Sequence, residues 1–417
     1  MREGLTVEEA QTTILGATRP LGAETLSTAL AANRVLAESI ESNRRQPPSD
    51  CSAMDGYAVH FADLEAASAD SPVLLPVVYE VAAGGHAERP LEAGEAARIF
   101  TGAPLPPGAD AVVRQEDTHP AAGGVEICVA ARHREHVRDG GEDFEIGDRL
   151  IEAGVVLGAA HLGVLASIGR SVVSVHQRPT VAILSGGDEL VEPDRAADSG
   201  QIVSSNSYTL AAQCREVGAD PVYLGIAEDR PEAIEARLRA GLRADVIVSS
   251  AGVSVGDHDH VREVLEKLGC KLDFWGVRMK PGFPMVFGVI ESRGTLVFGL
   301  PGNPVSASVT FEQFVRPALR KMLGHRALYR PVVRARLTQK MTKKAGRLHF
   351  VRVALEKRDG ALYATPTANQ SSGVLTSLIR GDGLAVFPAE QEELAVDTEV
   401  DVQILEATFF DQNERGF

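Results

Sequence analysis

The sequence is poor in cysteine and has no long apolar run. No run of about 18 apolar residues is present to span a bilayer as a helix. The first residues include early acids instead of the apolar core of a signal peptide. We therefore expect a cytoplasmic protein with no membrane partner. No two cysteines form a Cys-x-x-Cys pair, which leaves no zinc signature and suits a reducing compartment. The cysteines are Cys51, Cys128, Cys214 and Cys270.

Positive charge is also in short supply. The chain has 42 Lys and Arg against 57 Asp and Glu, a formal net charge of −15. No basic stripe is visible, so nucleic acid is not an expected partner, although a local basic pocket remains possible within an acidic chain. A hydrophobic content of 44% with 24% charged residues is typical of globular proteins. At 417 residues the chain exceeds one ordinary core, which suggests about three domains.

Helical signals are concentrated at the start of the chain. Thr6 and Glu9 form a capping box that predicts a helix to about Ala17. The spacing of Leu and Ala predicts that helix continues through residues 21–45, and another helix is expected at 159–168. Between these regions, short β-like runs broken by Gly and Pro predict a small β domain. They cover residues 73–81, 97–100, 111–115 and 125–129.

From Thr180 strands and helices alternate, which predicts a doubly wound α/β domain. The expected strands are 181–184, 222–226, 246–250 and 295–300, and the expected helices are 207–217, 230–240, 260–268 and 304–323. After His325 β-like runs return and predict a C-terminal β barrel or sandwich. We thus expect a multi-domain α/β plus β fold. Its parts are an elongated linker (1–45 and 145–177), an inserted β domain (46–144), the α/β domain (178–325) and a β-barrel domain (326–417).

The turn from Leu300 to Ala307 is the most informative segment. Pro301 and Gly302 end an apolar run, Asn303 is a good helix N-cap, and Pro304 suits the first helical position. Free N–H groups at a helix start beyond a strand's carboxyl end bind anions in α/β proteins. A well-capped turn with no ligand is the alternative.

Two other strand ends carry small residues followed by acids. Gly186 and Gly187 let the backbone approach a ligand closely, and Glu189 can face that ligand or a metal. After Ser250, small residues suit a phosphate, and Asp257 and Asp259 offer oxygen ligands that suit Mg²⁺. The neighbouring histidines, His258 and His260, lack zinc spacing and are more typical of solvated side chains.

Asp229 and Lys280 complete this set of strand-end residues. Asp229 either caps the helix that starts near Pro231 or binds a metal, and both readings stay open. Lys280, held by a Pro-Gly pair, suits an anion as a point charge. The four loops together predict a site for phosphate and a metal ion.

Seven strings in order, each alone most typical of a turn, together resemble one family, the molybdopterin molybdenumtransferases, which include the E domain of gephyrin-type proteins. The strings are SAMDGYA (52–58), TGAPLPPGADAVV (101–113), GED (141–143), SGGDEL (185–190), AGVSVGD (251–257), MKPG (279–282) and LPGNPVSA (300–307). The resemblance implies an elongated homodimer whose active site is shared between subunits. The region 178–325 would be its molybdopterin-binding domain. It implies insertion of molybdate into adenylylated molybdopterin with release of AMP, in the biosynthesis of the molybdenum cofactor. A molybdopterin adenylyltransferase and cofactor-receiving enzymes are then possible partners.

The resemblance also assigns roles to residues of this chain. Residues expected to act in the reaction are Asp55, Thr101, Asp143, Glu189, Asp229 and Asp259. Mg²⁺ would be held by Glu189, Asp229, Asp257 and Asp259. The substrates would be bound by Gly186, Gly187, Gly252, Ser254, Lys280, Pro301, Pro304, Arg352 and Ser372.

Two positions depart from the family pattern, and two other functions compete. Phe283 stands where many members have a second lysine, and the run Gln370-Ser371-Ser372-Gly373 leaves the choice between Ser371 and Ser372 open. A molybdopterin adenylyltransferase would share the α/β domain but would need only that domain. A scaffold role, as in gephyrin-type chains, would not need the acids. Molybdate and tungstate both remain candidate oxyanions.

Overall fold

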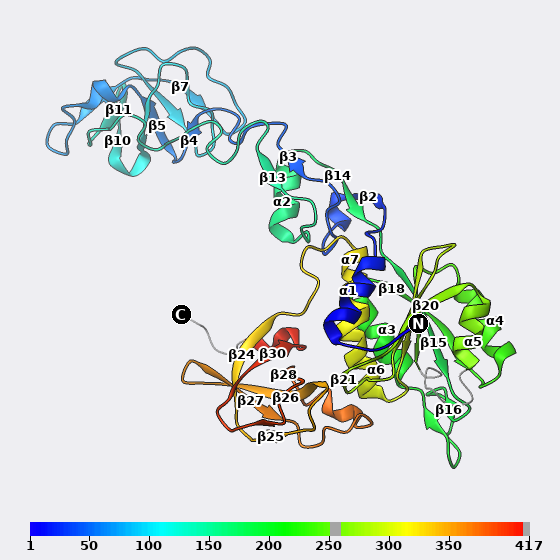
Figure 1. The fold of residues 1–417 in the computed structure, drawn as a ribbon. Helices are drawn as coiled ribbons and strands as arrows, with labels where there is room; N and C mark the ends of the chain where they lie inside the picture. The colour runs from blue at the N-terminus through cyan, green and yellow to red at the C-terminus, as the bar shows by residue number, and fades with distance from the viewer. Residues whose placement is uncertain (251–259, 412–417) are drawn as a thin grey trace. The chain divides into compact units, whose positions relative to one another are not determined.

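A computed structural model describes residues 1–250 and 260–411, and the chain divides into two compact units (Figure 1). The first unit comprises Met1–Glu38, Gly154–Ala159 and Val172–Phe417, and the second comprises Ser39–Ala153 and Ala160–Ser171. The four-part division expected from the sequence remains a prediction. No helix in the described part of the chain is long and apolar enough to cross a bilayer.

A seven-stranded mixed sheet forms the centre of the first unit, in the order β1-β20-β22-β23-β19-β15-β18. Its strands are β1 (Arg2–Leu5), β15 (Thr180–Gly186), β18 (Asp220–Ala227), β19 (Val246–Ser250), β20 (Cys270–Val277), β22 (Val286–Ile290) and β23 (Thr295–Leu300). The parallel pairs β18–β15–β19–β23 confirm the alternation expected from the sequence. In contrast, β20–β22–β23 are antiparallel. The short link between β22 and β23 allows only a hairpin, because a parallel crossover needs a dozen residues or more.

Helices cover both faces of this sheet (Figure 1). One face packs against α1 (Val7–Ala17), α3 (Asn206–Val217), α6 (Pro304–Thr310) and α7 (Arg316–Met322). The other packs against α4 (Pro231–Gly241) and α5 (His260–Lys267). The predicted capping box at Thr6 and Glu9 is present. Gly218 ends α3 in the left-handed conformation, with φ of 97°.

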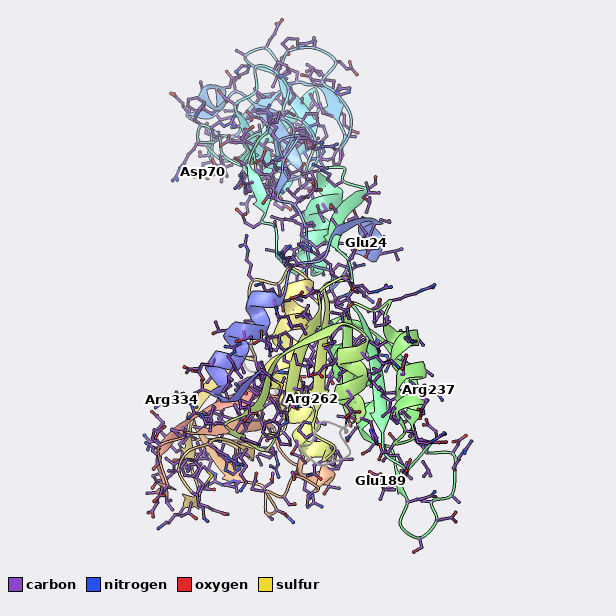
Figure 2. The ribbon with its side chains drawn as sticks, turned by 45° about the vertical axis from the view of Figure 1, so that its right-hand side comes forward. Glu24, Asp70, Glu189, Arg237, Arg262 and Arg334 are labelled. Carbon is purple, nitrogen blue, oxygen red and sulfur yellow. The ribbon has the colours of Figure 1, made fainter. Side chains whose placement is uncertain are left out.

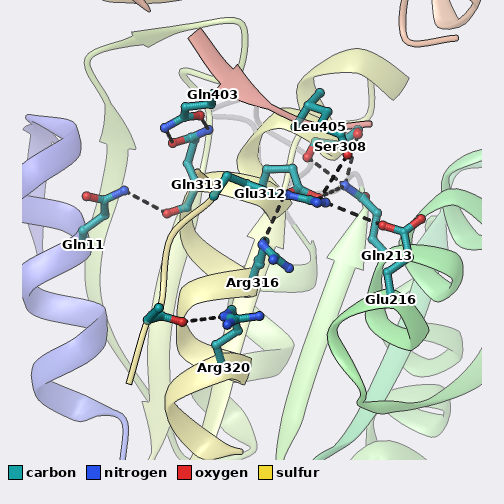
Figure 3. Close-up of polar contacts among 12 residues, drawn as sticks. Gln11, Gln213, Glu216, Ser308, Glu312, Gln313, Arg316, Arg320, Gln403 and Leu405 are labelled. Carbon is teal, nitrogen blue, oxygen red and sulfur yellow. Dashed lines mark hydrogen bonds and ion pairs between the residues drawn. The ribbon is translucent and has the colours of Figure 1, made fainter. Parts of the chain in front are cut away.

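The single helix expected at 304–323 is divided by a π-helical turn, η4 (Phe311–Val315), between α6 and α7. Glu312 in this turn is buried and accepts hydrogen bonds from Arg330 (Nε, 2.8 Å) and Gln213 (Nε2, 2.9 Å) (Figure 3). Gln313 donates from Nε2 to Oε1 of Gln403 in the C-terminal domain at 2.7 Å. This partly buried polar network joins the C-terminal domain to the α/β domain within one unit.

Five strands close into a C-terminal barrel, which confirms the predicted β barrel. They are β24 (Val332–Leu337), β26 (Leu348–Arg358), β27 (Ala361–Pro366), β28 (Gly383–Phe387) and β30 (Glu399–Ile404). The β26–β28 pairing completes the ring. A short strand, β21 (Met279–Lys280), leaves the α/β domain and pairs with β26, so the barrel lies directly beside Lys280.

The helix expected over residues 21–45 is wrong. The segment contains β2 (Ala23–Ser27), a 3-10 turn (Thr28–Leu30) and β3 (Ile40–Glu41). β2 pairs along its whole length with β14 (Val172–His176), and its burial alternates from residue to residue. Ala23 and Leu26, three residues apart, have helical spacing, so pairing with β14 and not the local pattern decided the structure.

The second unit contains the small β domain and one helix, α2 (Ala159–Ser167), whose first residue belongs to the first unit. A four-stranded sheet has the order β7-β8-β5-β9, and a three-stranded sheet the order β10-β11-β6. These strands are β5 (Gly56–Val59), β6 (Val73–Leu75), β7 (Val77–Val81), β8 (Ala96–Ile99), β9 (Ala111–Arg114), β10 (Thr118–Ala121) and β11 (Gly124–Ile127). A further pair joins β4 (Cys51–Ser52) to β12 (Val137–Arg138), and β13 (Arg149–Ile151) pairs with β3.

Candidate functional site

A cavity of 590 Å³ lies where residues 279–284, the turn after β23 and the barrel loop 370–372 meet. Of the described residues that line it, none is Asp or Glu. Its polar lining consists of Lys280, Asn303, Ser306, Arg347, Gln370, Ser371 and Ser372. A chain of net charge −15 thus contains a cavity whose ionisable side chains are all positive. We call it the oxyanion cavity.

A second cavity, also of 590 Å³, adjoins the first and shares Pro284, Pro301 and Asn303 with it. Its wall continues along the ends of β15 and β19 through Gly186 and Ser250. Hydroxyl and amide groups of 204–206 at the start of α3 line the far side. The structure therefore brings together residues from three strand ends that are spread over more than 100 positions of the sequence, from Gly186 to Pro301. We call this space the strand-end cavity.

Glycine at position 282 fixes the segment that carries Lys280. Gly282 has φ of 103°, and a Cβ there would lie 2.4 Å from Cγ2 of Thr310 in α6. The segment can therefore rest directly on the helix only with glycine. On its other side Lys280 pairs with His349 of β26. Lys280 is thus held between helix and barrel, with its own side chain exposed to the oxyanion cavity.

The start of α6 contributes less to anion binding than expected. Pro304 has no N–H, and the N–H of Val305 donates to the carbonyl of Ser372 at 3.1 Å. Asn303 occupies the N-cap position but makes no side-chain capping hydrogen bond. Asn206 of α3 donates from Nδ2 to the carbonyl of Gly302 at 2.7 Å and ties the two loops together. Side chains, more than these first helical N–H groups, face the cavity.

Arg352, expected at the molybdate side, is fully buried beneath the barrel loop. It donates to the carbonyls of Asn369 (3.2 Å) and Ser371 (3.1 Å) and to the hydroxyl of Ser377 (3.1 Å). Burial lowers the pKa of its guanidinium to about 10, and Nη1 has no partner among the described residues. Arg352 therefore holds the loop from below, whereas both Ser371 and Ser372 line the cavity.

Carboxylates gather at the other end of the site. Figure 2 shows Glu189 beyond the end of the sheet, before β16 (Leu190–Val191). Oδ1 of Asp188 accepts a hydrogen bond from the N–H of Asp229 at 2.9 Å. Partial burial, and then the charges of Asp188 and Glu189, raise the pKa of Asp229. Gly187, with φ of 139°, makes this turn possible, because residues with a side chain rarely adopt that backbone conformation.

These acids suit a hard cation, because oxygen ligands with mutually repelling charges gain most from Mg²⁺. Within residues 1–250 and 260–411, however, no three His, Cys, Asp or Glu side chains are arranged to hold a metal. The remaining predicted ligands, Asp257 and Asp259, lie outside the described residues, as do Gly252 and Ser254.

In the second unit the structure brings Asp55 and Thr101 together. Oδ1 of Asp55 accepts hydrogen bonds from the N–H (2.8 Å) and the hydroxyl (2.9 Å) of Thr101. These bonds lower the pKa of Asp55. Asp143 is exposed, and its N–H donates to the carbonyl of Gln46 at 2.9 Å.

Sequence reasoning missed several lining residues. Arg347 lies in the same string as Arg352, and Ser306 is a polar residue on an otherwise apolar helical turn. Such a polar position within an apolar run was a usable signal for Ser306. The residues around them do not indicate that Arg347, and not Arg352, lines the cavity. Asp188 lies within the string SGGDEL next to Glu189, but the sequence predicted no role for it.

Comparisons with known proteins agree over most of the chain. Residues 182–321 match a model described as a probable molybdopterin binding domain. Residues 5–169 match the MoeA N-terminal region (domain I and II), and 334–405 match the MoeA C-terminal region (domain IV). A molybdopterin molybdenumtransferase of Nostoc sp. is 41% identical over 364 residues, which are 86% of this chain and 83% of that protein. The chain belongs to the molybdopterin molybdenumtransferase family.

Further relatives extend this membership to the whole chain. The molybdopterin molybdenumtransferase of Haemophilus influenzae is 34% identical across 96% of this chain and 98% of its own length. The crystal structure of a molybdopterin biosynthesis MoeA protein from Pyrococcus horikoshii superposes with a TM-score of 0.84 at 34% identity, covering 96% of this chain and 99% of that one. The chain is therefore a transferase of molybdenum cofactor biosynthesis. Full-length agreement with molybdopterin molybdenumtransferases argues against the single-domain adenylyltransferase.

Proposed function

We propose that this chain inserts molybdate into adenylylated molybdopterin, with release of AMP, in the two adjoining cavities. The observation that carries this proposal is the oxyanion cavity, which has cationic and hydroxyl side chains and, among its described lining, no acid. A small dianion is bound by such donors through charge-assisted hydrogen bonds. Lys280 supplies charge, and Ser306, Ser371 and Ser372 supply O–H donors.

The strand-end cavity would hold the phosphate-bearing part of the pterin substrate. Its glycine and serine lining lets a phosphate approach the backbone and provides hydroxyl donors. Pro301, shared by both cavities, gives a rigid wall that keeps the two substrates adjacent. This arrangement supports reaction by positioning, since correctly placed reactants lose little further freedom at the transition state.

A divalent cation, Mg²⁺, belongs to the proposal at the acidic end. Asp188, Glu189 and Asp229, with Asp257 and Asp259 of the following loop, would hold it. When bound, it would neutralise the charge of the pyrophosphate that links the pterin to adenosine, whose cleavage releases AMP. The raised pKa of Asp229 supports this, because a carboxylate crowded by two others is stabilised by a cation.

A homodimer would complete the site, with Asp55, Thr101 and Asp143 supplied by a second copy of the chain. Exposed apolar side chains beside the strand-end cavity support burial by a partner, since Ile202 is 57% and Tyr208 58% exposed. A molybdopterin adenylyltransferase would supply the substrate, and an enzyme that uses the cofactor would receive the product. Mass measurement in solution tests the dimer.

The decisive experiment measures AMP release from adenylylated molybdopterin with and without molybdate. We expect release to depend on molybdate and to stop in excess EDTA. Incubation with molybdopterin and ATP is the control for the rival activity, and formation of the adenylylated pterin there would contradict our proposal. Asp55→Ala should abolish AMP release and leave the dimer intact. Full AMP release by that variant would show that the Asp55 carboxylate is not needed for the reaction, whereas no molybdate-dependent release by the unmodified chain would favour a scaffold function.

A further inference from the structure

The oxyanion cavity contains a second cation that the sequence did not single out. Arg347 lines it together with Lys280. Its backbone is fixed on both sides, because the N–H of Gly346 donates to the carbonyl of Ala389 (2.8 Å) and that of Leu348 donates to Arg278 (3.0 Å). Arg347 therefore enters the cavity from a rigid point at the start of β26.

An aromatic pair positions the Arg347 side chain. Its guanidinium carbon lies 4.4 Å from the ring centroid of Phe283, within the range of a cation–π contact. Phe283 in turn packs edge-to-face on Trp275, with centroids 5.4 Å apart. Stacking on a ring engages the face of the guanidinium and leaves its N–H edge available. Phe283 and Arg347 both line the cavity, so this edge belongs to its wall.

The guanidinium of Arg347 makes no hydrogen bond to the described residues, in contrast to that of Arg352. Among residues 1–250 and 260–411, Arg347 has no hydrogen-bond or ion-pair partner beyond its contact with Phe283. Arg352, five residues later, is fully buried, and its Nε and Nη2 donate to the barrel loop. Of these two arginines, Arg347 is the one whose donors can reach a ligand in the cavity.

We propose that Arg347 is the second cationic ligand, beside Lys280, for a doubly charged tetrahedral oxyanion, and that Phe283 positions its guanidinium. The planar fork of arginine binds two oxygens of one anion, whereas lysine acts as a point charge. Naming molybdate as that oxyanion rests on the proposed function. A phosphate of the pterin substrate has the same chemistry and is the alternative source.

The test compares molybdate binding and turnover in matched variants of the full chain. Molybdate alone is titrated by calorimetry, and KM is measured separately for molybdate and for adenylylated molybdopterin. Arg347→Ala should weaken molybdate binding about tenfold and raise the KM for molybdate by the same factor. This is the usual size of the effect when a charge-assisted hydrogen bond is lost. Arg347→Lys should lose less, and Phe283→Leu about threefold, because only positioning is lost. Lys344→Ala, an exposed cation nearby that does not line the cavity, should stay within about twofold as the control.

The double variant Phe283→Lys with Arg347→Ala separates charge from structure. A lysine at 283 would return a cation to the same wall, so it should recover part of the lost affinity, which a structural role for Arg347 does not predict. Unchanged molybdate affinity in Arg347→Ala, with the same unfolding temperature, would overturn the inference. A raised KM for the pterin substrate alone would overturn it in favour of phosphate. Absence of molybdate-dependent AMP release in the unmodified chain would instead contradict the proposed function, whatever Arg347 does to binding.

Discussion

The oxyanion cavity and the cluster of Asp188, Glu189 and Asp229 carry opposite charge, and the pKa of one group beside each reflects it. Beside the oxyanion cavity, burial and then the charges of Lys280 and Arg352 lower the pKa of His349 to about 4. At the acidic end, burial and then Asp188 and Glu189 raise the pKa of Asp229. One end is thus prepared for an anion and the other for a cation. A substrate with an anionic phosphate chain can lie across both ends only if a cation occupies the acidic end.

Of the two charged ends, the basic end should show the larger effect when charge is removed. Lys280→Ala takes away the cation held between Gly282 and β26, and we expect turnover with molybdate to fall about 100-fold, the typical cost of a lost oxyanion donor. Steady-state AMP release measures it. Lys344→Ala is the matched control, and near-normal turnover of Lys280→Ala would show that the basic end does not bind the reacting anion.

His349 tests the same end through stability. Both ring nitrogens lack partners among the described residues, and the side chain is buried. Its pKa is about 4 in the folded state against 6.5, so the unfolded chain binds more protons and stability falls as pH drops from 6.5 to 4. Relative to the unmodified chain, His349→Phe should gain about 2 kcal/mol between pH 7.5 and 5.

Urea unfolding at the two pH values measures this gain. His325, whose pKa is also lowered to about 4 by burial, has the same sign and stays in both proteins, so only the difference between them reports His349. Equal pH dependence in the two proteins would place the proton uptake elsewhere.

Removing charge from the acidic end should change turnover less than Lys280→Ala does, and it should weaken the binding of a cation instead of an anion. Asp229→Asn removes one of three crowded carboxylates, so we expect about tenfold more Mg²⁺ to be needed for half-maximal turnover. Because the pKa of Asp229 is raised, the cation requirement of the unmodified chain should grow as pH falls through that pKa. Without Mg²⁺ the variant should unfold at a slightly higher temperature, since repulsion is relieved. Glu228→Gln, an exposed neighbour paired with Arg230, is the control.

The contrast between Arg347 and Arg352 shows which parts of the site could be predicted from the sequence and which could not. The turn after β23, with its prolines and glycine, was predictable because those residues act locally. The parallel half of the sheet was predictable from alternation. The antiparallel β20 and β22 were not, because strand direction depends on pairing. Which arginine faces the cavity depends on where β26 begins and how the barrel closes, and neither is encoded within Gly346–Val353 alone.

The smallest effect is expected in the second unit, from loss of the Thr101 hydroxyl that donates to Asp55. Thr101→Val removes the hydroxyl donor and keeps the N–H donor, so the pKa of Asp55 should move up toward its ordinary value. The lowered pKa keeps Asp55 ionised to lower pH, so the acid-side loss of turnover should begin at higher pH in the variant. Near neutral pH we expect about a threefold loss, because one of two hydrogen bonds still orients the carboxylate. Thr101→Ser keeps the hydroxyl and should behave like the unmodified chain. If turnover of Thr101→Val fell at the same acid pH as that of the unmodified chain, the Asp55 carboxylate would not act in the reaction. The charged groups that matter for turnover would then all lie at the basic and acidic ends of the first unit.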